Sequence, residues 1–187
     1  MTAPSNAPAN KSLKLTINGK ETGPLDVPDG LMMLDFLHEY AHQTGTRLGC
    51  GIGECRACVV IIDQPDGSSA EMRTCITGAH FFAGKKIRTV EAHAKRNDKG
   101  EVVELSPVQQ KFLEHYSFQC GYCTPGFVNG ATVLVERLKR KPVAKSRVEA
   151  EITAALNTHL CRCTGYVRYY EAVKDVILST PGLTVEG

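Results

Sequence analysis

The stretch FQCGYCTPG, residues 118–126, and its downstream partner LCRCTGY, residues 160–166, decide how the second half of this chain folds. Cys120 and Cys123 have two residues between them, whereas the cysteines at 161 and 163 have only one. If the helices between the two stretches fold back on each other, all four thiols converge. Four converging thiolates are typical of a metal site.

A second set of four cysteines lies upstream, in and after the stretch GCGIGECRAC at residues 49–58. Its members are Cys50, Cys55, Cys58 and Cys75. Four residues separate the first from the second, two separate the second from the third, and sixteen precede the fourth. This is the spacing of plant-type ferredoxins, which bind an iron-sulfur cluster through four thiolates.

Glycines alternate with other residues in this loop and explain how it can wind tightly around a cluster. We expect Gly49, Gly51 and Gly53 to adopt positive φ and to let backbone N–H groups point at the sulfur atoms. The pattern G-x-G-x-G also occurs in dinucleotide-binding loops. No helix pattern follows it here and cysteines crowd it, so the sequence favours the cluster over a dinucleotide.

The remaining patterns of the first half predict a sheet with one helix packed on it. Asn18-Gly19 is the strongest short signal for a hairpin turn. Apolar residues at helical spacing over residues 31–41 predict the helix. Alternation and apolar runs predict strands at residues 13–17, 20–27, 59–62, 71–76 and 87–90. A sheet, one helix and a cysteine loop between them indicate a β-grasp domain.

The second half predicts four helices in two hairpins, each with a cysteine pair at its bend. Capping boxes at residues 106–109 and 146–149 predict the starts of the first and third helices. Thr124-Pro125 predicts the start of the second, and the last begins near Tyr166 and turns Tyr170 inward. A four-helix bundle of this kind can bury a four-thiolate site at one end.

Together these patterns predict an α+β chain of two domains joined by a polar linker. The linker segment is rich in Lys, Asn, Asp and Gly and shows no periodicity, and the first residues resemble a flexible arm. We expect an arm at residues 1–12, a β-grasp ferredoxin-like domain at 13–91, a linker at 92–104 and a helical domain at 105–187.

The composition is that of a globular protein with little attraction for nucleic acid or acidic membranes, because the net charge is only +2. No apolar run is long enough to span a membrane. No export signal is recognisable, so we expect a cytoplasmic location, or a periplasmic one if a partner carries the signal. Reduced thiols then favour metal ligation over a disulfide framework. No nucleophile with a base and no carboxylate pair is marked for catalysis.

Taken in order, CGIGECRAC, RTC, SPVQQKFLEHYSFQCGYCTPG and LCRCTGY resemble the small iron-sulfur subunit of the molybdenum hydroxylases, the xanthine oxidase and aldehyde oxidoreductase family. The resemblance covers nearly the whole chain and all eight cysteines. It implies a plant-type ferredoxin domain followed by a helical [2Fe-2S] domain. It also implies an electron-transfer subunit without a substrate site of its own, within a multi-subunit oxidoreductase for aldehydes or N-heterocycles.

The resemblance further implies a role for each cysteine set and for two neighbouring residues. One [2Fe-2S] cluster would be held by Cys50, Cys55, Cys58 and Cys75, and the other by Cys120, Cys123, Cys161 and Cys163. Gln119 and Cys163 would lie against the molybdopterin cofactor of a large partner subunit, where electrons enter this chain. The ferredoxin-like cluster would pass them on to FAD or haem on a flavin or cytochrome subunit.

Arg56 departs from the family pattern, in which glycine commonly follows the second cysteine. We expect its side chain to point outward or to contact a partner, and we hypothesise that its charge tunes or docks the exit cluster. His115 and His159 lie near cysteine pairs and are expected to pack beside the site rather than to bind iron. Two other functions stay open: a free two-cluster ferredoxin-like carrier and a zinc-stabilised interaction module.

Overall fold

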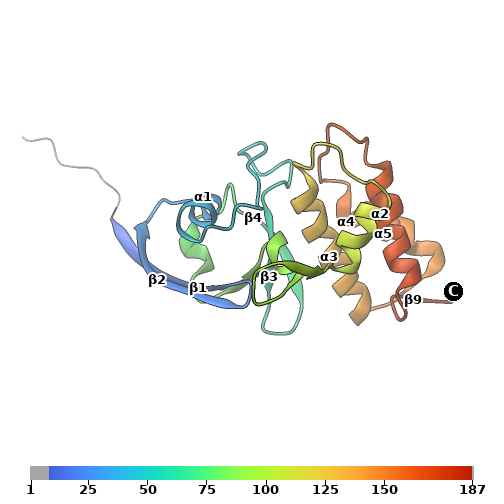
Figure 1. Cartoon of the computed structure of the whole chain (residues 1–187), viewed down its shortest axis with the longest axis horizontal. Helices are drawn as coiled ribbons and strands as arrows, with labels where there is room; N and C mark the ends of the chain where they lie inside the picture. The colour runs from blue at the N-terminus through green and yellow to red at the C-terminus, as the bar shows by residue number, and fades with distance from the viewer. Residues whose placement is uncertain (1–8, 187) are drawn as a thin grey trace, which may run out of the picture.

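The first half of the molecule is built on one five-stranded sheet (Figure 1). In the computed structural model, which describes residues 9–186, the strand order is β2-β1-β5-β3-β4. The strands are β1 (Asn10–Ile17), β2 (Lys20–Pro28), β3 (Val59–Asp63), β4 (Ser69–Arg73) and β5 (Lys86–Arg88). β1 and β5 run parallel, and the other neighbours are antiparallel. The sheet is therefore mixed.

The predicted hairpin is confirmed. Asn18 and Gly19 both adopt positive φ, at 53° and 80°. A two-residue hairpin loop of type I′ requires positive φ at both of its residues. β1 begins at Asn10, before the predicted start at residue 13, so the predicted arm is too long at its C-terminal end. Residues 1–8 of that predicted arm lie outside the residues that the structure describes.

The helix predicted over residues 31–41 is only partly confirmed. A short α-helix, α1 (Met33–Asp35), runs directly into the π-helix η1 (Phe36–Tyr40). The Ala41 N–H donates to the carbonyl oxygen of Phe36, five residues back, which is the wider π pattern. Phe36 is fully buried against the sheet. The apolar spacing thus indicated the buried face but not the type of helix.

A small ribbon forms in the segment predicted to be an unstructured linker. β6 (Lys95–Arg96) pairs antiparallel with β7 (Val102–Glu104). An exposed ion pair joins Lys95 Nζ to a carboxylate oxygen of Glu104 over 2.6 Å. Alternation of apolar and polar residues predicts a strand only over four or more residues, and these strands are shorter. The sequence therefore did not indicate them. Two 3-10 helices, η2 (Ala79–Phe82) and η3 (Val90–Ala92), flank β5.

Four α-helices form the second half and enclose a hydrophobic core of their own (Figure 1). They are α2 (Pro107–Glu114), α3 (Thr124–Arg140), α4 (Val148–Leu156) and α5 (Val167–Ser179). The fully buried rings of Phe127 and Tyr169 stack with centroids 4.1 Å apart. Two short parallel strands, β8 (Val143–Ala144) and β9 (Thr184–Val185), tie the α3–α4 connection to the C-terminal segment. Within residues 9–186, no helix combines the length and the apolar character that a membrane crossing needs.

The capping box predicted at the start of α2 is confirmed. The Ser106 hydroxyl accepts the N–H of Gln109, and the side-chain oxygen of Gln109 accepts the N–H of Ser106. Pro107 occupies the first helical position. Both interactions lie within four consecutive residues, which is why the sequence motif was sufficient to indicate them.

Of the other three predicted helix starts, the last is confirmed, because α5 begins at Val167 directly after Tyr166. At the other two, the predicted capping does not form. α3 begins at Thr124, but the capping position is Cys123, and the Thr124 hydroxyl bonds Tyr169 instead of the helix end. The capping box predicted at Ser146 does not form, because the 3-10 turn η4 (Lys145–Arg147) occupies that position and precedes α4. Tertiary contacts override the local signals at both places.

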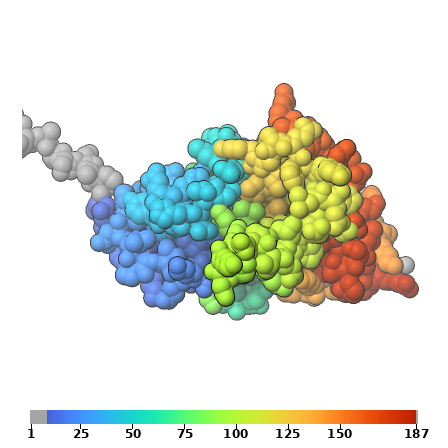
Figure 2. All heavy atoms as spheres, in the orientation of Figure 1, coloured from blue at the N-terminus to red at the C-terminus, as the bar shows by residue number. Residues whose placement is uncertain are grey.

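The two halves are joined along α3, which packs against β3 and β4 (Figure 1). Asn129 on α3 is fully buried, and its Nδ2 donates to the Val59 carbonyl oxygen of β3 over 2.7 Å. Its Oδ1 lies 2.7 Å from Nε2 of His93. Figure 2 shows the helical half continuous with the sheet half on the viewed face. The loops before β3, α3 and α5 meet at this boundary, along the upper edge of Figure 1.

Candidate metal centres

The first cysteine set lies in the loop before β3 and just after β4. The N–H of Cys55 donates to Sγ of Cys50 over 3.4 Å, so these two residues form one pair. Cys58 directly precedes β3, and Cys75 follows β4. Because β3 and β4 pair antiparallel, the Cys58 thiol contacts that of Cys75 and forms a second pair.

Backbone N–H groups surround the Cys50 thiol. Hydrogen bonds led by the N–H of Cys55, with that of Ile52, lower the pKa of Cys50 to about 6, although partial burial opposes the shift. Gly51 and Gly53 adopt φ of 71° and 79°, which turns the loop so that its amides face inward. A thiol that ionises at neutral pH is suited to bind a metal.

Gly49 does not behave as predicted, because its φ is not positive. A Cβ at this position would lie 2.6 Å from Sγ of Cys55, closer than atoms can approach without displacement. Glycine is needed at residue 49 to let the backbone pass close to a thiol, and not for its conformational freedom. The other thiols of the set are more buried, and burial raises the pKa of Cys55 and raises that of Cys75 to about 11.

The second cysteine set lies at the bends between the helices. Sγ of Cys120 and Sγ of Cys163 are 3.5 Å apart and form an outer, exposed pair. The thiols of Cys123 and Cys161 contact each other and form an inner pair. Burial raises the pKa of Cys123 to about 12. Burial also opposes ionisation of Cys161, but a hydrogen bond from the Thr164 hydroxyl, 3.0 Å away, contributes to a lowered pKa.

Tyr169 on α5 lies behind the inner pair and was not indicated by the sequence. Its hydroxyl is 2.7 Å from the Thr124 hydroxyl and 3.6 Å from Sγ of Cys123. Burial raises its pKa far above the usual range of tyrosine. The sequence pattern had turned Tyr170 inward, but Tyr170 is only partly buried and its neighbour at 169 faces the core. The helical apolar spacing beginning at Tyr169 was the signal that could have found it.

The outer pair opens to solvent. Gln119, Cys120 and Cys163 are all exposed. Apolar side chains three residues before and four residues after Cys163 are also exposed: Leu160 is 49% accessible and Val167 is 60% accessible. The second set therefore has a covered inner side and an apolar outer edge, and the predicted pterin-facing residues, Gln119 and Cys163, lie on that outer edge.

The pairwise arrangement of the thiols fits two-iron clusters. Each cysteine set meets as two pairs, and a [2Fe-2S] cluster offers two irons that each take two thiolates. A single zinc ion needs four ligands within about 2.3 Å. Among residues 9–186, no group of three or more His, Cys, Asp or Glu side chains converges closely enough to hold one metal ion. The residues fit the two-iron group.

The two cysteine loops touch each other directly. The N–H of Leu160 donates to the Cys55 carbonyl oxygen over 3.2 Å. The Tyr122 hydroxyl donates to the Leu48 carbonyl oxygen over 2.7 Å, and the Arg47 guanidinium lies 5.9 Å from the centre of the Tyr122 ring. Both sites therefore lie against one shared boundary, which the sequence separation between them did not reveal.

Arg56 does not point outward. Its Nη1 donates to Oε2 of Glu71 over 2.9 Å, and its side chain is only 26% exposed, so the prediction of an outward side chain is wrong. Its backbone has φ of 57°, in the left-handed region, which is the physical reason why glycine suits this position. Burial opposes ionisation of Glu71, but hydrogen bonds and charges of His159 and Arg56 hold its pKa below the usual range.

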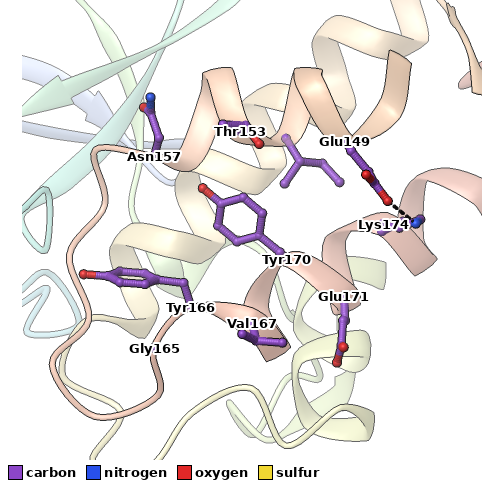
Figure 3. Close-up of a pocket in the computed structure, with 10 residues that line it drawn as sticks. Glu149, Thr153, Asn157, Gly165, Tyr166, Val167, Tyr170, Glu171 and Lys174 are labelled. Carbon is purple, nitrogen blue, oxygen red and sulfur yellow. Dashed lines mark hydrogen bonds and ion pairs between the residues drawn. The ribbon is translucent and has the colours of Figure 1, made fainter. Parts of the chain in front are cut away.

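A groove of about 640 Å³ lies between α4 and α5 (Figure 3). Val167 and Tyr170 contribute apolar surface to it, and Glu149 pairs with Lys174 at its rim. None of the described residues that line it is a cysteine. Gly165, two residues after Cys163, also lines the groove, which therefore begins near the exposed edge of the second set.

Comparison with known proteins matches both halves of the chain. Residues 15–81 match the 2Fe-2S iron-sulfur cluster binding domain, and residues 89–174 match the [2Fe-2S] binding domain. The chain is 37% identical over 177 residues to the nicotine 6-hydroxylase small subunit of Paenarthrobacter nicotinovorans, and the alignment covers 94% of each chain.

Two further comparisons give the same result. The chain is 31% identical to the aldehyde oxidoreductase iron-sulfur-binding subunit of Escherichia coli K12, over 92% of this chain and 74% of that subunit. A chain in the crystal structure of quinoline 2-oxidoreductase from Pseudomonas putida 86 superimposes with a TM-score of 0.74 at 31% identity, and 94% of each chain is covered.

Proposed function

The chain belongs to the small iron-sulfur subunits of the molybdenum hydroxylases, the xanthine oxidase and aldehyde oxidoreductase family, and on that premise we propose which residues hold its clusters and where electrons pass. It is an electron-transfer subunit with two [2Fe-2S] domains. We infer a β-grasp domain that begins with β1 at Asn10 and extends to residue 91, and a four-helix domain over residues 105–186. The two separate hydrophobic cores support this division.

The ligands of the two clusters are assigned from one observation, the meeting of the thiols in pairs. The first cluster takes Cys50, Cys55, Cys58 and Cys75, and the second takes Cys120, Cys123, Cys161 and Cys163. Each pair supplies the two thiolates of one iron. The amides around Cys50 and the Thr164 hydroxyl near Cys161 are positioned to stabilise negative charge on the sulfur atoms.

The protein supplies holding and shielding groups around chemistry that belongs to the clusters. When bound, each [2Fe-2S] cluster carries one electron, so two of them divide the two electrons released by substrate oxidation. Tyr169 covers the inner pair of the second site and keeps solvent from Cys123. Cys120 and Cys163 remain at the surface, so electrons enter the chain at this edge.

The exposed residues support two docking positions. The large molybdopterin-binding subunit covers the edge formed by Gln119 and Cys163, where Leu160 and Val167 offer apolar contact. The flavin or cytochrome subunit covers the loop of the first site, where Ile52 is 68% accessible. Burial of these apolar side chains against a partner would remove them from water. A free carrier would have less need of the apolar edge beside the second set.

The substrate of the complex is selected on the large subunit. The relatives are named for nicotine, aldehydes and quinoline, which agrees with an aldehyde or N-heterocycle as the class. We expect the complex in the cytoplasm, or in the periplasm if a partner carries the export signal.

Two cysteine variants test the cluster assignment. In the purified complex, Cys58→Ser is expected to remove the electron paramagnetic resonance (EPR) signal of one cluster, and Cys161→Ser that of the other, each with loss of about half of the bound iron. Thr164→Val is the control, because it removes the hydrogen bonds of this hydroxyl with Cys161 and with the Tyr166 N–H and leaves every thiol in place. Loss of the same signal in both cysteine variants, or zinc in place of iron, would contradict the assignment.

A further inference from the structure

A short chain of polar side chains crosses the boundary between the two cysteine loops. Arg56 comes from the first loop, Glu71 from β4 and His159 from the loop before α5. Nη1 of Arg56 lies 2.9 Å from Oε2 of Glu71, and Nε2 of His159 lies 3.1 Å from the same oxygen. The three residues thus connect Cys55, the neighbour of Arg56, with Cys161, two residues after His159.

These three side chains are largely buried. The side chain of His159 is 1% exposed, that of Glu71 is 14% exposed and that of Arg56 is 26% exposed. Burying an ion pair costs desolvation free energy that its attraction does not always recover, so such a pair is weak support for a role in stability alone. A buried pair does impose a defined geometry on the segments that carry it.

The backbone of Arg56 and Cys55 is also constrained by close contacts. Arg56 adopts positive φ, which a side chain other than glycine rarely does. A Cβ on Gly126 of α3 would lie 2.2 Å from the Arg56 carbonyl oxygen, so the helix and the loop are in direct contact there. The next carbonyl upstream, that of Cys55, accepts the N–H of Leu160. The arginine side chain and its backbone therefore fasten one loop to the other.

We propose that Arg56, Glu71 and His159 form a positioning element that fixes the first cluster loop against the second and so sets the separation of the two clusters. The proposal rests on the proposed function, since it requires a cluster in each loop. Electron tunnelling weakens steeply as the separation grows, so a loose boundary would slow transfer between the clusters. The three are positioning residues and not ligands.

A competing explanation is that Arg56 acts through its charge on the first cluster. The two explanations predict different effects of removing Arg56 and of removing the Glu71 charge. If charge acted alone, Arg56→Gly would lower the potential of the first cluster and Glu71→Gln would raise it, because one removes a positive and the other a negative charge. If the element acts by position, both variants weaken the magnetic coupling between the clusters in the same direction.

The experiment is EPR spectroscopy of the fully reduced complex at low temperature, where the two reduced clusters split each other's signals. In Arg56→Gly and in Glu71→Gln we expect loss of the resolved splitting and slower transfer between the clusters, with full iron content. Arg56→Lys, which can still reach toward Glu71, should retain part of the splitting. Asp29→Asn is the control, because it removes a carboxylate of an exposed ion pair, and the partner of that pair, Lys11, lies on β1 and not in a cysteine loop.

The possible outcomes distinguish failure of the positioning role from failure of the cluster assignment. Unchanged splitting in both variants, with both cluster signals present, would overturn the positioning role and leave the cluster assignment intact. Opposite shifts of the first potential with unchanged splitting would replace it by the charge explanation. A wild-type complex in which only one cluster signal is found would contradict the proposed function itself.

Discussion

Gly126 is the residue at which α3 touches the first cysteine loop, and its missing side chain is what permits the contact. A Cβ there would lie 2.2 Å from the carbonyl oxygen of Arg56 and 3.2 Å from Cα of Ala57. Both are backbone atoms, which cannot rotate away as a flexible side chain can. The loop would have to move as a whole.

We therefore predict that Gly126→Ala loosens the first cluster more than the second. Alanine favours a helix over glycine by about 1 kcal/mol, so a purely local effect would stabilise the protein. We expect the clash with the loop backbone to outweigh this gain. The apparent Tm should fall, and the signal of the first cluster should be lost faster in the presence of an iron chelator. Gly30→Ala is the matched control, because nothing lies within 4 Å of its Cβ position. A higher apparent Tm in Gly126→Ala would show that the loop adapts.

At the scale of elements, the helix starts show why equal sequence motifs can have unequal consequences. The signature of a capping box occurs at Ser106 and at Ser146. Only Ser106 bonds a helix end. The segment before α4 is instead held by pairing of β8 with β9, which brings the chain into the helix through the 3-10 turn η4. The conformation of the segment before the helix thus decides whether the capping interactions can form.

This difference gives a paired prediction. Ser106→Ala should lower the stability of the helical half by about 1 kcal/mol, the usual effect of losing a capping side chain. Ser146→Ala should change it by less than about 0.5 kcal/mol, as an exposed substitution without a partner does. Thermal unfolding followed by circular dichroism at one scan rate compares the two. Equal losses would mean that Ser146 caps α4 in solution.

At the scale of the whole molecule, an ion network joins the sheet to the helices. Arg88 of β5 contacts Asp63 of β3 and Glu136 of α3, each at 2.7 Å. Burial opposes ionisation of Glu136, but hydrogen bonds from Arg88 and from Ser69 hold its pKa below its ordinary value of 4.5. These residues are partly buried, so solvent screens the network less than it screens an exposed pair.

The network predicts a stability difference that depends on pH. Because the folded pKa of Glu136 lies below the unfolded one, its contribution is complete above about pH 4.5 and declines as the pH falls through the folded value. Glu136→Gln should therefore destabilise the protein by about 1–2 kcal/mol near pH 7, and the difference from wild type should shrink in acid.

The measurement is the apparent Tm of both proteins in buffers from neutral pH down to about pH 4. Glu149→Gln is the control, because Glu149 pairs with Lys174 on the exposed surface and its variant should differ much less from wild type. A difference between Glu136→Gln and wild type that grows as the pH falls would contradict the assignment of the stabilisation to the ionised carboxylate.

The sequence by itself determined the features that are encoded in neighbouring residues. The Asn18-Gly19 turn, the Ser106 capping box and the positive φ of Gly51 and Gly53 each depend on a few consecutive positions. The eight cysteines and their spacings carried the resemblance to the family, and the two domain matches agree with it. The apolar spacing of α1 and η1 indicated the buried face, because burial acts on side chains whichever helix type carries them.

Only the tertiary structure decided how these parts meet. The contact of Arg56 with Glu71 and His159 and the place of Tyr169 behind Cys123 join residues far apart in the chain. Such contacts depend on how the two hydrophobic cores dock along α3, and no local pattern of hydrophobicity or turn residues encodes that docking. For the same reason, the sequence indicated that four thiols would gather at each site but not that both sites would share one boundary.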